Sequence, residues 1–457
     1  MSVVPVQDVL KTTHSILCFP TELLCEIFKY LIPQRPEDNF GLVLTHVCRH
    51  WRETAIGLHF LWTFLDFRSP ELAKEMLKRS GQAPLRIHFK HCYSSTGASR
   101  EYHIARMQLL SEALSHSHRL ETIEFPYIDD FSLYTLAEEH TKAAPLLRSL
   151  YITSDYDDEC SLPLNFLGGT APLLVDMALK GCGLAYNSPL LSNLTSLKLT
   201  GGYETVLEER FCDALHFMPV LECLCLCDVY CRAPATNTPV ANLPMLRKLD
   251  IKWSYLLNGS RLFNHISFPG TAVVKITTLE RATLNATLDE VDTFLVDVTR
   301  VFSPDFCPGY ERDVKTLAAT CCADTTSFTL RAWHTPLPSG FSTGDSLSEP
   351  SEHAALYPPN FSTRITWSKK GSARYGDHAL FEAFFKATFR RLHVLEFPVL
   401  EMIAFPADLM KYALTSDWPS RPLRKLILHG SRYVEQEGCE EIYTFSGVDD
   451  GVYPVFD

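Results

Sequence analysis

The sequence predicts an α/β fold in which a short N-terminal group of three helices precedes a long, irregular solenoid. In the solenoid we expect a parallel sheet on the concave side and helical returns on the other side. Two observations predict this fold. Apolar residues recur at helical spacing between residues 20 and 66. A hexad of the form L-x-x-L-x-L then recurs at intervals of 20 to 27 residues.

The first predicted helix begins in the stretch FPTELLCEIF, residues 19–28. Pro20 suits the first turn because its missing N–H has no partner to lose there, and Glu22 lies near the positive end of the helix dipole. Pro33 and Pro36 are expected to end the helix. The apolar residues that recur at helical spacing are Leu23, Leu24, Ile27, Phe28 and Leu31.

Two further short helices are predicted, over residues 42–51 and over the stretch AIGLHFLWTFLDF, residues 55–67. The apolar set of the first of them is Leu42, Val43, Leu44, Val47, Cys48 and Trp51. Three such helices can build only a small core. We therefore expect neighbouring parts of the chain to cover one part of their apolar surface and another protein to cover the rest.

The stretches LCFPTELLCEIFKYLIP and LVLTHVCRHWRETA together resemble an F-box. The resemblance covers residues 16–56 and includes the proline, the aliphatic spacing and the Cys-Arg-x-Trp-Arg block, although the linker QRPEDNFG is a few residues longer than usual. It implies an F-box over residues 16–66 that binds a Skp-type adaptor and, through it, a cullin–RING ubiquitin ligase. The implied adaptor-binding residues are Pro20, Leu23, Leu24, Ile27, Phe28, Leu31, Val47, Cys48 and Trp51.

Trp51 is the strongest of these candidates because a large indole in a desolvated pocket is the usual form of a binding hot spot. The alternative is that all of these residues pack internally against the domain that follows. The continuation of the chain also resembles fungal F-box proteins with leucine-rich-repeat-like C-terminal regions.

The repeated hexad begins at residues 120, 147, 174, 194, 221 and 246, and it returns at 392 and 423. Its spacing falls in the range of leucine-rich repeats. We expect the first, fourth and sixth residues of each hexad to point inward and the short strand between them to join a parallel sheet. One such unit leaves a bare apolar face, so neighbouring units must stack.

Helical returns are predicted between the strands, and a proline precedes several strands, at Pro145, Pro172, Pro219 and Pro244. Only one hexad is followed by the Asn or Cys of a regular repeat, here Cys182. The array over residues 67–430 should therefore be irregular. The apolar faces of two predicted returns are Leu110, Ala113, Leu114 and Phe211, Ala214, Leu215, Met218.

The remaining segments are predicted from local composition. Strands are expected at TAVVKITTL, TSFTLRAW and STRITWS, as degenerate repeats with long returns, and helical faces at residues 291–298 and 381–385. Residues 334–363 are rich in Pro, Ser and Gly and are expected to form a mobile loop. Residues 1–15 should be flexible, and the acidic tail over residues 431–457 should be partly disordered.

Charge and composition exclude several classes of function. A net charge of −12 disfavours nucleic acid and anionic membranes as partners. Residues 1–18 lack the pattern of a signal peptide, and no stretch approaches the about 20 apolar residues of a membrane span. We therefore expect an intracellular protein, cytoplasmic or nuclear, whose fifteen cysteines carry reduced thiols.

No cofactor, metal site or catalytic residue is predicted. Cys223, Cys225, Cys227 and Cys231 alternate along a predicted strand and lack the spacing that lets thiolates converge on zinc. The letters Gly-Asp-Ser-Leu around Ser346 match the block of GDSL-type serine hydrolases, but no Asp-x-x-His follows to supply the base. A hydrolase using Ser346 is the least favoured hypothesis.

The favoured function is therefore a noncatalytic substrate receptor of an SCF-type ubiquitin ligase, with an unknown protein as its target. The candidate target-binding residues lie on the concave strands between the inward leucines: Ser196, Lys198, Cys223, Cys225, Lys248 and Asp250. The alternative is a repeat scaffold that binds proteins without any role in ubiquitin transfer. In that case the N-terminal helices serve only as a cap for the first repeat.

Overall fold

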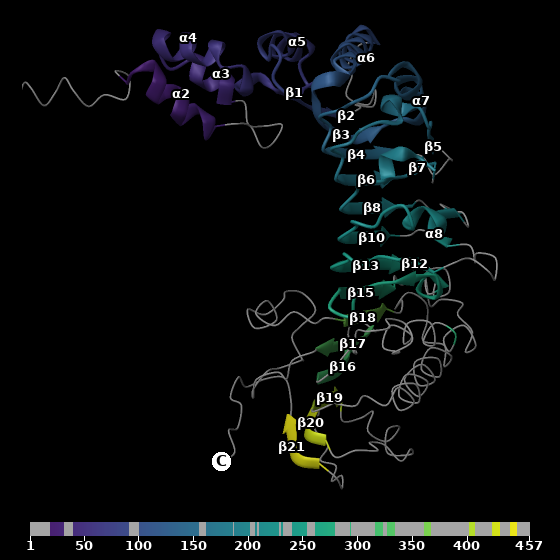
Figure 1. The fold of residues 1–457 in the computed structure, drawn as a ribbon. Coiled ribbons are helices and arrows are strands. Elements are labelled where there is room, and N and C mark those ends of the chain that lie inside the picture. The colour runs from purple at the N-terminus through teal and green to yellow at the C-terminus, as the bar shows by residue number, and fades with distance from the viewer. Residues whose placement is uncertain are drawn as a thin grey trace, which may run out of the picture. The chain divides into compact units, whose positions relative to one another are not determined.

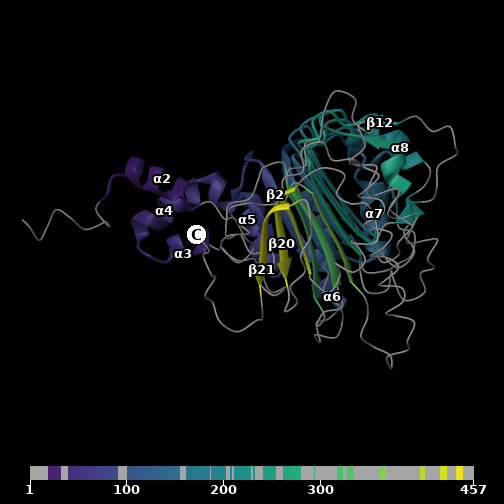
Figure 2. The same ribbon diagram turned by 90° about the horizontal axis from the view of Figure 1, so that it is seen from below.

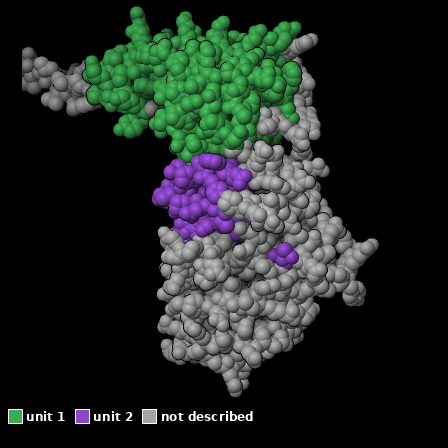
Figure 3. Space-filling view, turned by 45° about the vertical axis from the view of Figure 1, so that its right-hand side comes forward, with its two compact units in different colours: residues 1–194 green, residues 195–457 purple. Residues whose placement is uncertain are grey.

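A computed structural model describes most of the chain up to residue 278 and isolated strands beyond it. The described ranges are residues 19–31, 40–90, 100–154, 161–185, 187–201, 206–207, 210–227, 230–231, 240–253, 261–278 and 293, and six strands between 316 and 445. The chain divides into two compact units, Met1–Leu194 and Thr195–Asp457 (Figure 3).

The first unit begins with three helices, α2 (Thr21–Lys29), α3 (Phe40–Thr45) and α4 (Arg49–Gly57). Pro20 occupies the N-cap position of α2, and Leu31 lies beyond the end of that helix. The prediction of a single helix over residues 42–51 is wrong, because the helical conformation is interrupted between α3 and α4. Cys48 takes an extended conformation there, and its Sγ accepts a hydrogen bond from the Trp51 N–H at 3.5 Å, so it caps α4.

The prediction of a third helix over residues 55–67 is also wrong. After α4 the chain forms a 3₁₀ turn, η2 (His59–Trp62), and then a strand, β1 (Phe64–Asp66), that pairs in parallel with β2 (Leu85–Lys90). All three residues of β1 are buried. A continuous apolar run of this kind gives no periodicity by which a buried strand can be told from a buried helix.

The N-terminal helices are fixed to the repeats through η2. The Trp62 side chain is 1% exposed, and its Nε1–H donates to the Ala55 carbonyl at 2.9 Å. Gly41 of α3 lies so close that an added Cβ would be 3.3 Å from the Trp62 ring and 3.2 Å from the Leu61 carbonyl oxygen. The small core of these helices therefore continues into the first repeat.

The strands of the first unit run in parallel in the order β1, β2, β3 (Leu120–Ile128), β4 (Ser149–Ser154) and β6 (Asp176–Lys180). The helices α5 (Pro70–Arg79), α6 (Arg100–Ser115) and α7 (Asp130–Glu139) connect the earlier strands. Figure 1 shows β2, β3, β4 and β6 following one another, with α6 and α7 beside them. The strands β1 and β2 extend the array before the first predicted hexad.

The returns of the first unit after β4 contain short pieces in place of α-helices. These pieces are the paired strands β5 (Ser161–Leu162) and β7 (Gly183–Leu184) and the 3₁₀ turns η5 (Phe166–Gly169) and η6 (Pro189–Leu191); a further turn, η4 (Ser117–Arg119), precedes β3. Cys182, the cysteine that follows the hexad at residue 174, is 7% exposed, and its Sγ lies 3.5 Å from the Gly183 carbonyl oxygen. This mixture of returns agrees with the irregular solenoid predicted from the sequence.

The second unit opens with four parallel strands, β8 (Ser196–Thr200), β10 (Cys223–Cys227), β13 (Lys248–Trp253) and β15 (Val273–Thr278). Its returns hold α8 (Arg210–Leu215), η7 (Arg261–Asn264) and the pairs β9 (Val206–Leu207) with β11 (Tyr230–Cys231) and β12 (Ala241–Asn242) with β14 (Ile266–Ser267). Figure 2 shows α8 and β12 on the same side of these strands.

The inward positions of the six hexads are confirmed as the core. Their first, fourth and sixth residues are at most 2% exposed, with Leu199 as the half-buried exception. The apolar faces predicted for two of the helical returns are buried as well. One lies on α6, and the other lies on α8 and continues into the residues just after it. The buried hexad residues are Leu120, Ile123, Phe125, Leu147, Leu150, Ile152, Leu174, Met177, Leu179, Leu194, Leu197, Leu221, Leu224, Leu226, Leu246, Leu249 and Ile251.

The sequence predicted a parallel sheet, but the sheet of the second unit is parallel only in part. The strand β17 (Ser327–Trp333) pairs antiparallel with both β16 (Thr316–Cys322) and β18 (Phe361–Thr366), and β18 pairs in parallel with β15. Only four residues separate β16 from β17. Such a connection allows a hairpin and is too short for a parallel crossover.

The last strands are β19 (Met402–Pro406), β20 (Leu423–His429) and β21 (Cys439–Phe445), which pair in parallel in this order. The hexad at residue 423 forms β20, as predicted, whereas the hexad at 392 lies outside the described residues. Within the tail expected to be partly disordered, residues 439–445 form β21, which pairs with β20, and the other residues of the tail lie outside the described residues. The helical faces expected at 291–298 and 381–385 and most of the loop over 334–363 also lie outside the described residues.

Candidate functional site

The residues of α2 divide into a buried set and an exposed set. Leu24 and Phe28 are 0% exposed, so they belong to the core of the helical group, and a partner cannot touch them without rearranging it. Leu23 is 52% exposed. Pro20 is exposed, whereas Ile27 and Leu31 are half-buried. Of the adaptor-binding residues predicted on this segment, Leu23 and Pro20 are therefore the most accessible to a binding partner.

Trp51 of α4 is half-buried and packs edge to face on Phe28, with the ring centroids 5.2 Å apart. Its Nε1–H is buried and has no hydrogen-bond partner among the residues that the structure describes. The indole is thus part of the internal core as well as a candidate contact. Val47, in the break before α4, is 45% exposed, and Cys48 is half-buried.

Large apolar side chains are concentrated on the outside of this helical group. Among the described residues, seventeen such side chains are exposed, and six of them lie between residues 19 and 57. This density is higher than in the longer repeat region, where the others are scattered. The six are Leu23 (52%), Tyr30 (91%), Phe40 (37%), Val43 (60%), Val47 (45%) and Ile56 (40%).

Four of these six were missed as site residues by the sequence analysis. Val43 was assigned to the apolar face of one continuous helix. Because the helix is interrupted at residues 46–48, the side of α3 that carries Val43 does not continue into the buried face of α4. Tyr30, Phe40 and Ile56 lie at or near helix ends, where periodicity carries little information. Only the geometry of the three helices reveals their exposure.

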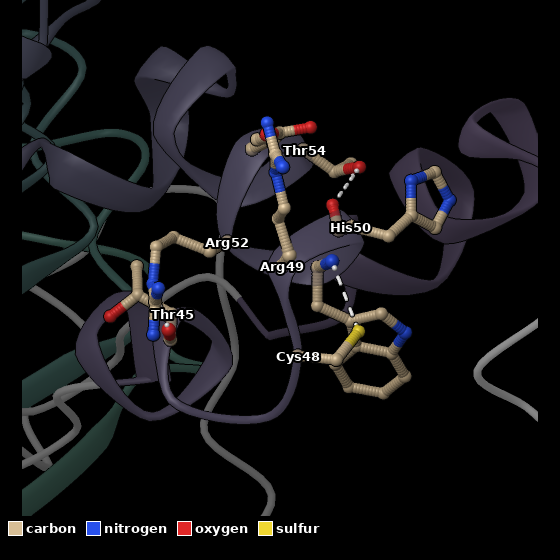
Figure 4. Close-up of polar contacts among 8 residues, drawn as sticks. Thr45, Cys48, Arg49, His50, Arg52 and Thr54 are labelled. Atoms are coloured by element: carbon tan, nitrogen blue, oxygen red, sulfur yellow. Dashed lines mark hydrogen bonds and ion pairs between the residues drawn. The ribbon is translucent and has the colours of Figure 1, made fainter.

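Polar contacts fix the positions of these helices (Figure 4). The Arg52 Nε–H donates to the Thr45 carbonyl at 2.7 Å, which ties α4 to the end of α3. The Thr54 hydroxyl donates to the His50 carbonyl at 2.9 Å. His50 Nε2 lies 3.1 Å from the Phe19 carbonyl oxygen, just before α2. The exposed apolar side chains therefore stand on a rigid frame.

The second candidate site is the open face of the second unit, the strand surface opposite the buried leucines. The register brings all six predicted target-binding residues together on it: Cys223 lies opposite Ser196 and Lys248, and Cys225 lies opposite Lys198 and Asp250. Each of the six is half-buried or exposed. The open face comprises Ser196, Lys198, Thr200, Cys223, Cys225, Cys227, Lys248, Asp250 and Lys252.

The thiols of this face have an unusual electrostatic setting. A hydrogen bond from Cys223 lowers the pKa of Cys225 to about 7, and the charges of Lys248 and Lys198 act in the same direction. Burial and the carboxylate of Asp250 oppose this effect. The sequence places Cys223 and Cys225 among the candidate target-binding residues, but it does not predict the lowered thiol pKa, because the lysines on the neighbouring strands are about 25 residues away in the sequence.

The strands of the first unit carry a different set of polar groups on the corresponding face. His88 Nδ1 lies 3.0 Å from a Glu124 carboxylate oxygen, and the Tyr151 hydroxyl donates to the Asp176 carboxylate. Burial, followed by this hydrogen bond, raises the pKa of Tyr151 to about 12, so its hydroxyl stays protonated. These groups satisfy one another and leave no reactive centre among them.

The part of the chain that the structure describes holds no group of three or more His, Cys, Asp and Glu side chains that could bind a metal ion. None of its helices has the length and apolar character needed to cross a bilayer. Ser346 and its surroundings lie outside the described residues.

The fold defines the class of protein: a mixed α/β repeat protein with N-terminal helices. No family model and no curated protein matches the chain. Among solved structures, the chain is similar to one described as the crystal structure of the Rad7 and Elc1 complex in yeast. The identity is 15% and the TM-score 0.28, over 94% of this chain and 87% of that chain. Because the TM-score is so low, nothing is transferred from that complex to this protein.

Proposed function

We propose that this protein is a noncatalytic substrate receptor of an SCF-type ubiquitin ligase. In this proposal an F-box over residues 16–66 binds a Skp-type adaptor, and the open face of the repeats binds a target protein. One observation carries it: within the stretch that resembles an F-box, Leu24 and Phe28 close the core while Leu23, Val43 and Val47 stand outside it, 45 to 60% exposed.

The energetics favour a partner for these helices. Complete burial of one Leu or Val side chain is worth about 1.5–3 kcal/mol. Single exposed side chains of this kind are ordinary on any protein, but six within one small helical group are typical of a binding surface. The frame formed by Arg52, Thr45 and His50 holds these side chains in place, so little conformational entropy is lost when a partner binds.

The repeats supply the second requirement of a receptor, a surface that holds another protein in a fixed position. Parallel strands in register keep the open face extended and rigid, and such faces are the usual contact surfaces of solenoid proteins. A receptor needs no reactive groups of its own, because it raises the effective concentration of the target beside the enzyme that modifies it.

Copurification tests the proposal directly. A Leu23→Lys, Val47→Lys double variant should lose the Skp-type adaptor and the cullin from the proteins bound to the full chain, since two charges would enter the apolar contact. Phe131→Lys is the matched control, because this α7 side chain is 80% exposed and lies outside the helical group. Retention of the adaptor by a folded double variant would refute the proposal.

The second candidate function is a protein-binding scaffold without a role in ubiquitin transfer. One observation favours it: Gly41 and Trp62 join the N-terminal helices closely to η2, as expected of a cap on the first repeat. In that case no adaptor copurifies with the wild-type chain. The GDSL-type hydrolase has no supporting observation, and esterase activity that is lost in Ser346→Ala would be needed to revive it.

A further inference from the structure

Two thiols lie side by side on the open face of the second unit. Cys223 and Cys225 are two residues apart on β10, so their side chains project from the same face of the strand. Both are half-buried, and neither forms a disulfide. Lysines flank them on both neighbouring strands, with Lys198 of β8 opposite Cys225 and Lys248 of β13 opposite Cys223.

This setting differs from that of another cysteine in the same unit. Cys212 of α8 is 7% exposed, and burial, helped by the nearby charge of Asp213, raises the pKa of its thiol to about 11. Cys212 is therefore protonated and shielded at neutral pH. The pKa of the Cys225 thiol is lowered to about 7, so Cys225 has a much larger thiolate fraction than Cys212 at that pH, and the thiolate is the nucleophilic form.

We propose that Cys225 is a modification site that forms a mixed disulfide with a small anionic thiol of the glutathione type. Lys198 and Lys248 recognise the carboxylates of the incoming molecule, and Cys223 stabilises the reacting thiolate by hydrogen bonding. Because both lysines are exposed, they can reach a tripeptide lying over the strand.

The reaction is a thiol–disulfide exchange. The Cys225 thiolate attacks one sulfur of glutathione disulfide, the bond between the two glutathione sulfurs breaks, and a bond forms between Cys225 Sγ and that sulfur. One glutathione leaves as a thiolate and takes a proton from water. Glutathione disulfide is the oxidant, so no other redox partner is needed.

The backbone explains why the mixed disulfide should persist. A bond between Cys223 and Cys225 would expel the second glutathione, but residues two apart on a strand have Cα atoms about 6.6–6.8 Å apart, at the upper limit for a disulfide. The strand cannot pucker to shorten this distance, because β10 pairs in register with β8 on one side and with β13 on the other. Exchange should therefore stop at the adduct.

The adduct would change the character of the open face. It would cover Lys198 and Lys248 and add carboxylates to a surface that is otherwise rich in lysine. If this face binds the target, which rests on the proposed function, oxidation would block that binding. The modification itself does not depend on the adaptor or on the target.

The test uses the purified, reduced full chain incubated with glutathione disulfide at several pH values, with intact mass and peptide mapping as readouts. Cys225 should be the fastest cysteine to gain glutathione, with a rate that is half-maximal near its pKa of about 7. Cys212 is an internal control, which should react only after denaturation. Cys225→Ser should lose the fastest adduct, and circular dichroism should show that the variant is folded.

A second comparison isolates the role of the lysines. Lys198→Gln and Lys248→Gln should slow the exchange with glutathione disulfide more than the exchange with hydroxyethyl disulfide, a neutral probe. Equal slowing of both would contradict recognition of the carboxylates. The proposal is overturned if another cysteine reacts first or if the rate rises only around the ordinary thiol pKa of about 8.5. An internal Cys223–Cys225 disulfide formed in place of the adduct would overturn it as well.

Discussion

Neighbouring side chains on α2 have different roles, depending on the side of the helix from which they project. Phe28 is completely buried and contacts Trp51, whereas Leu23, little more than one helical turn earlier, is half exposed. The sequence analysis grouped both as adaptor-binding residues, because a family pattern does not state which positions face inward. Only the packing of α2 against α4 separates them.

Substitutions at these two positions should therefore have different effects. Phe28→Ala should lower the free energy of unfolding of this unit by about 3–5 kcal/mol, since it leaves a cavity beneath Trp51. Leu23→Ala should change it by less than about 0.5 kcal/mol. Chemical denaturation followed by tryptophan fluorescence measures both values. Similar losses for the two variants would contradict the assignment of Leu23 to the outside.

The charge of Asp250 should oppose ionisation of the neighbouring Cys225. Replacing the carboxylate in Asp250→Asn removes a negative charge that disfavours the thiolate, so the pKa of Cys225 should fall below about 7. Lys198→Gln removes a positive charge, and the pKa should rise. The pH dependence of alkylation at Cys225 measures both shifts. Shifts of the same sign in both variants would contradict this electrostatic account.

At the scale of elements, the hexads predict the strands well because their physical signal is local and repeated. Every first and fourth residue of the six consecutive hexads is buried, so the pattern predicts both the strands and the side that faces the core. Prediction failed where structure depends on the conformation of a single residue or on distant pairing. The extended backbone of Cys48 separates the two parts of one expected helix, and β1 pairs with the distant strand β2.

Arg106 is an element-scale contact that sequence patterns do not reveal. This residue of α6 is 1% exposed, and its guanidinium donates to the Phe67 carbonyl at 2.8 Å and to the Lys90 carbonyl at 2.5 Å. The same group lies 4.8 Å from the centre of the Phe89 ring. It thus ties α6 to the chain immediately after β1 and to the last residue of β2.

Arg106→Leu should destabilise the first unit by about 1–3 kcal/mol, because the buried Phe67 carbonyl and the partly buried Lys90 carbonyl would lose their donor. Arg106→Lys should restore only part of this loss, since an ammonium cannot reproduce the planar fork. Thermal denaturation compares the variants, and hydrogen exchange at the end of β2 localises the effect. Full recovery in Arg106→Lys would contradict the role of the guanidinium geometry.

At the scale of the whole molecule, the proposed function assigns different tasks to different surfaces. In this proposal the apolar side chains on the N-terminal helices bind an adaptor, and the lysines, thiols and carboxylate on the open face of the second unit bind a target. Motif and repeat period predict both surfaces, and their binding roles stay predictions. The sequence could not predict the exposure of Tyr30, Phe40 and Ile56 or the lowered pKa of Cys225, because these depend on neighbours brought together by folding.

Binding of the adaptor should stabilise the unit that contains the helices. At an adaptor concentration of about 100 times Kd, the stabilisation should be about 2.7 kcal/mol, provided that the unfolded chain does not bind. Thermal denaturation of the full chain with increasing adaptor measures this shift. Leu23→Lys, with a Kd at least about tenfold higher, should be stabilised by no more than about 1.4 kcal/mol at the same adaptor concentration, whereas Phe131→Lys should retain the full shift.

The most direct test of the central claim is the Kd between the purified full chain and a Skp-type adaptor, measured for the wild type, Leu23→Lys and Phe131→Lys. We predict that the wild type and Phe131→Lys bind equally well. Leu23→Lys should bind at least about tenfold more weakly, a loss of about 1.4 kcal/mol or more. A wild-type chain that does not bind, or a folded Leu23→Lys variant with unchanged Kd, would contradict the claim that these helices carry an adaptor-binding surface.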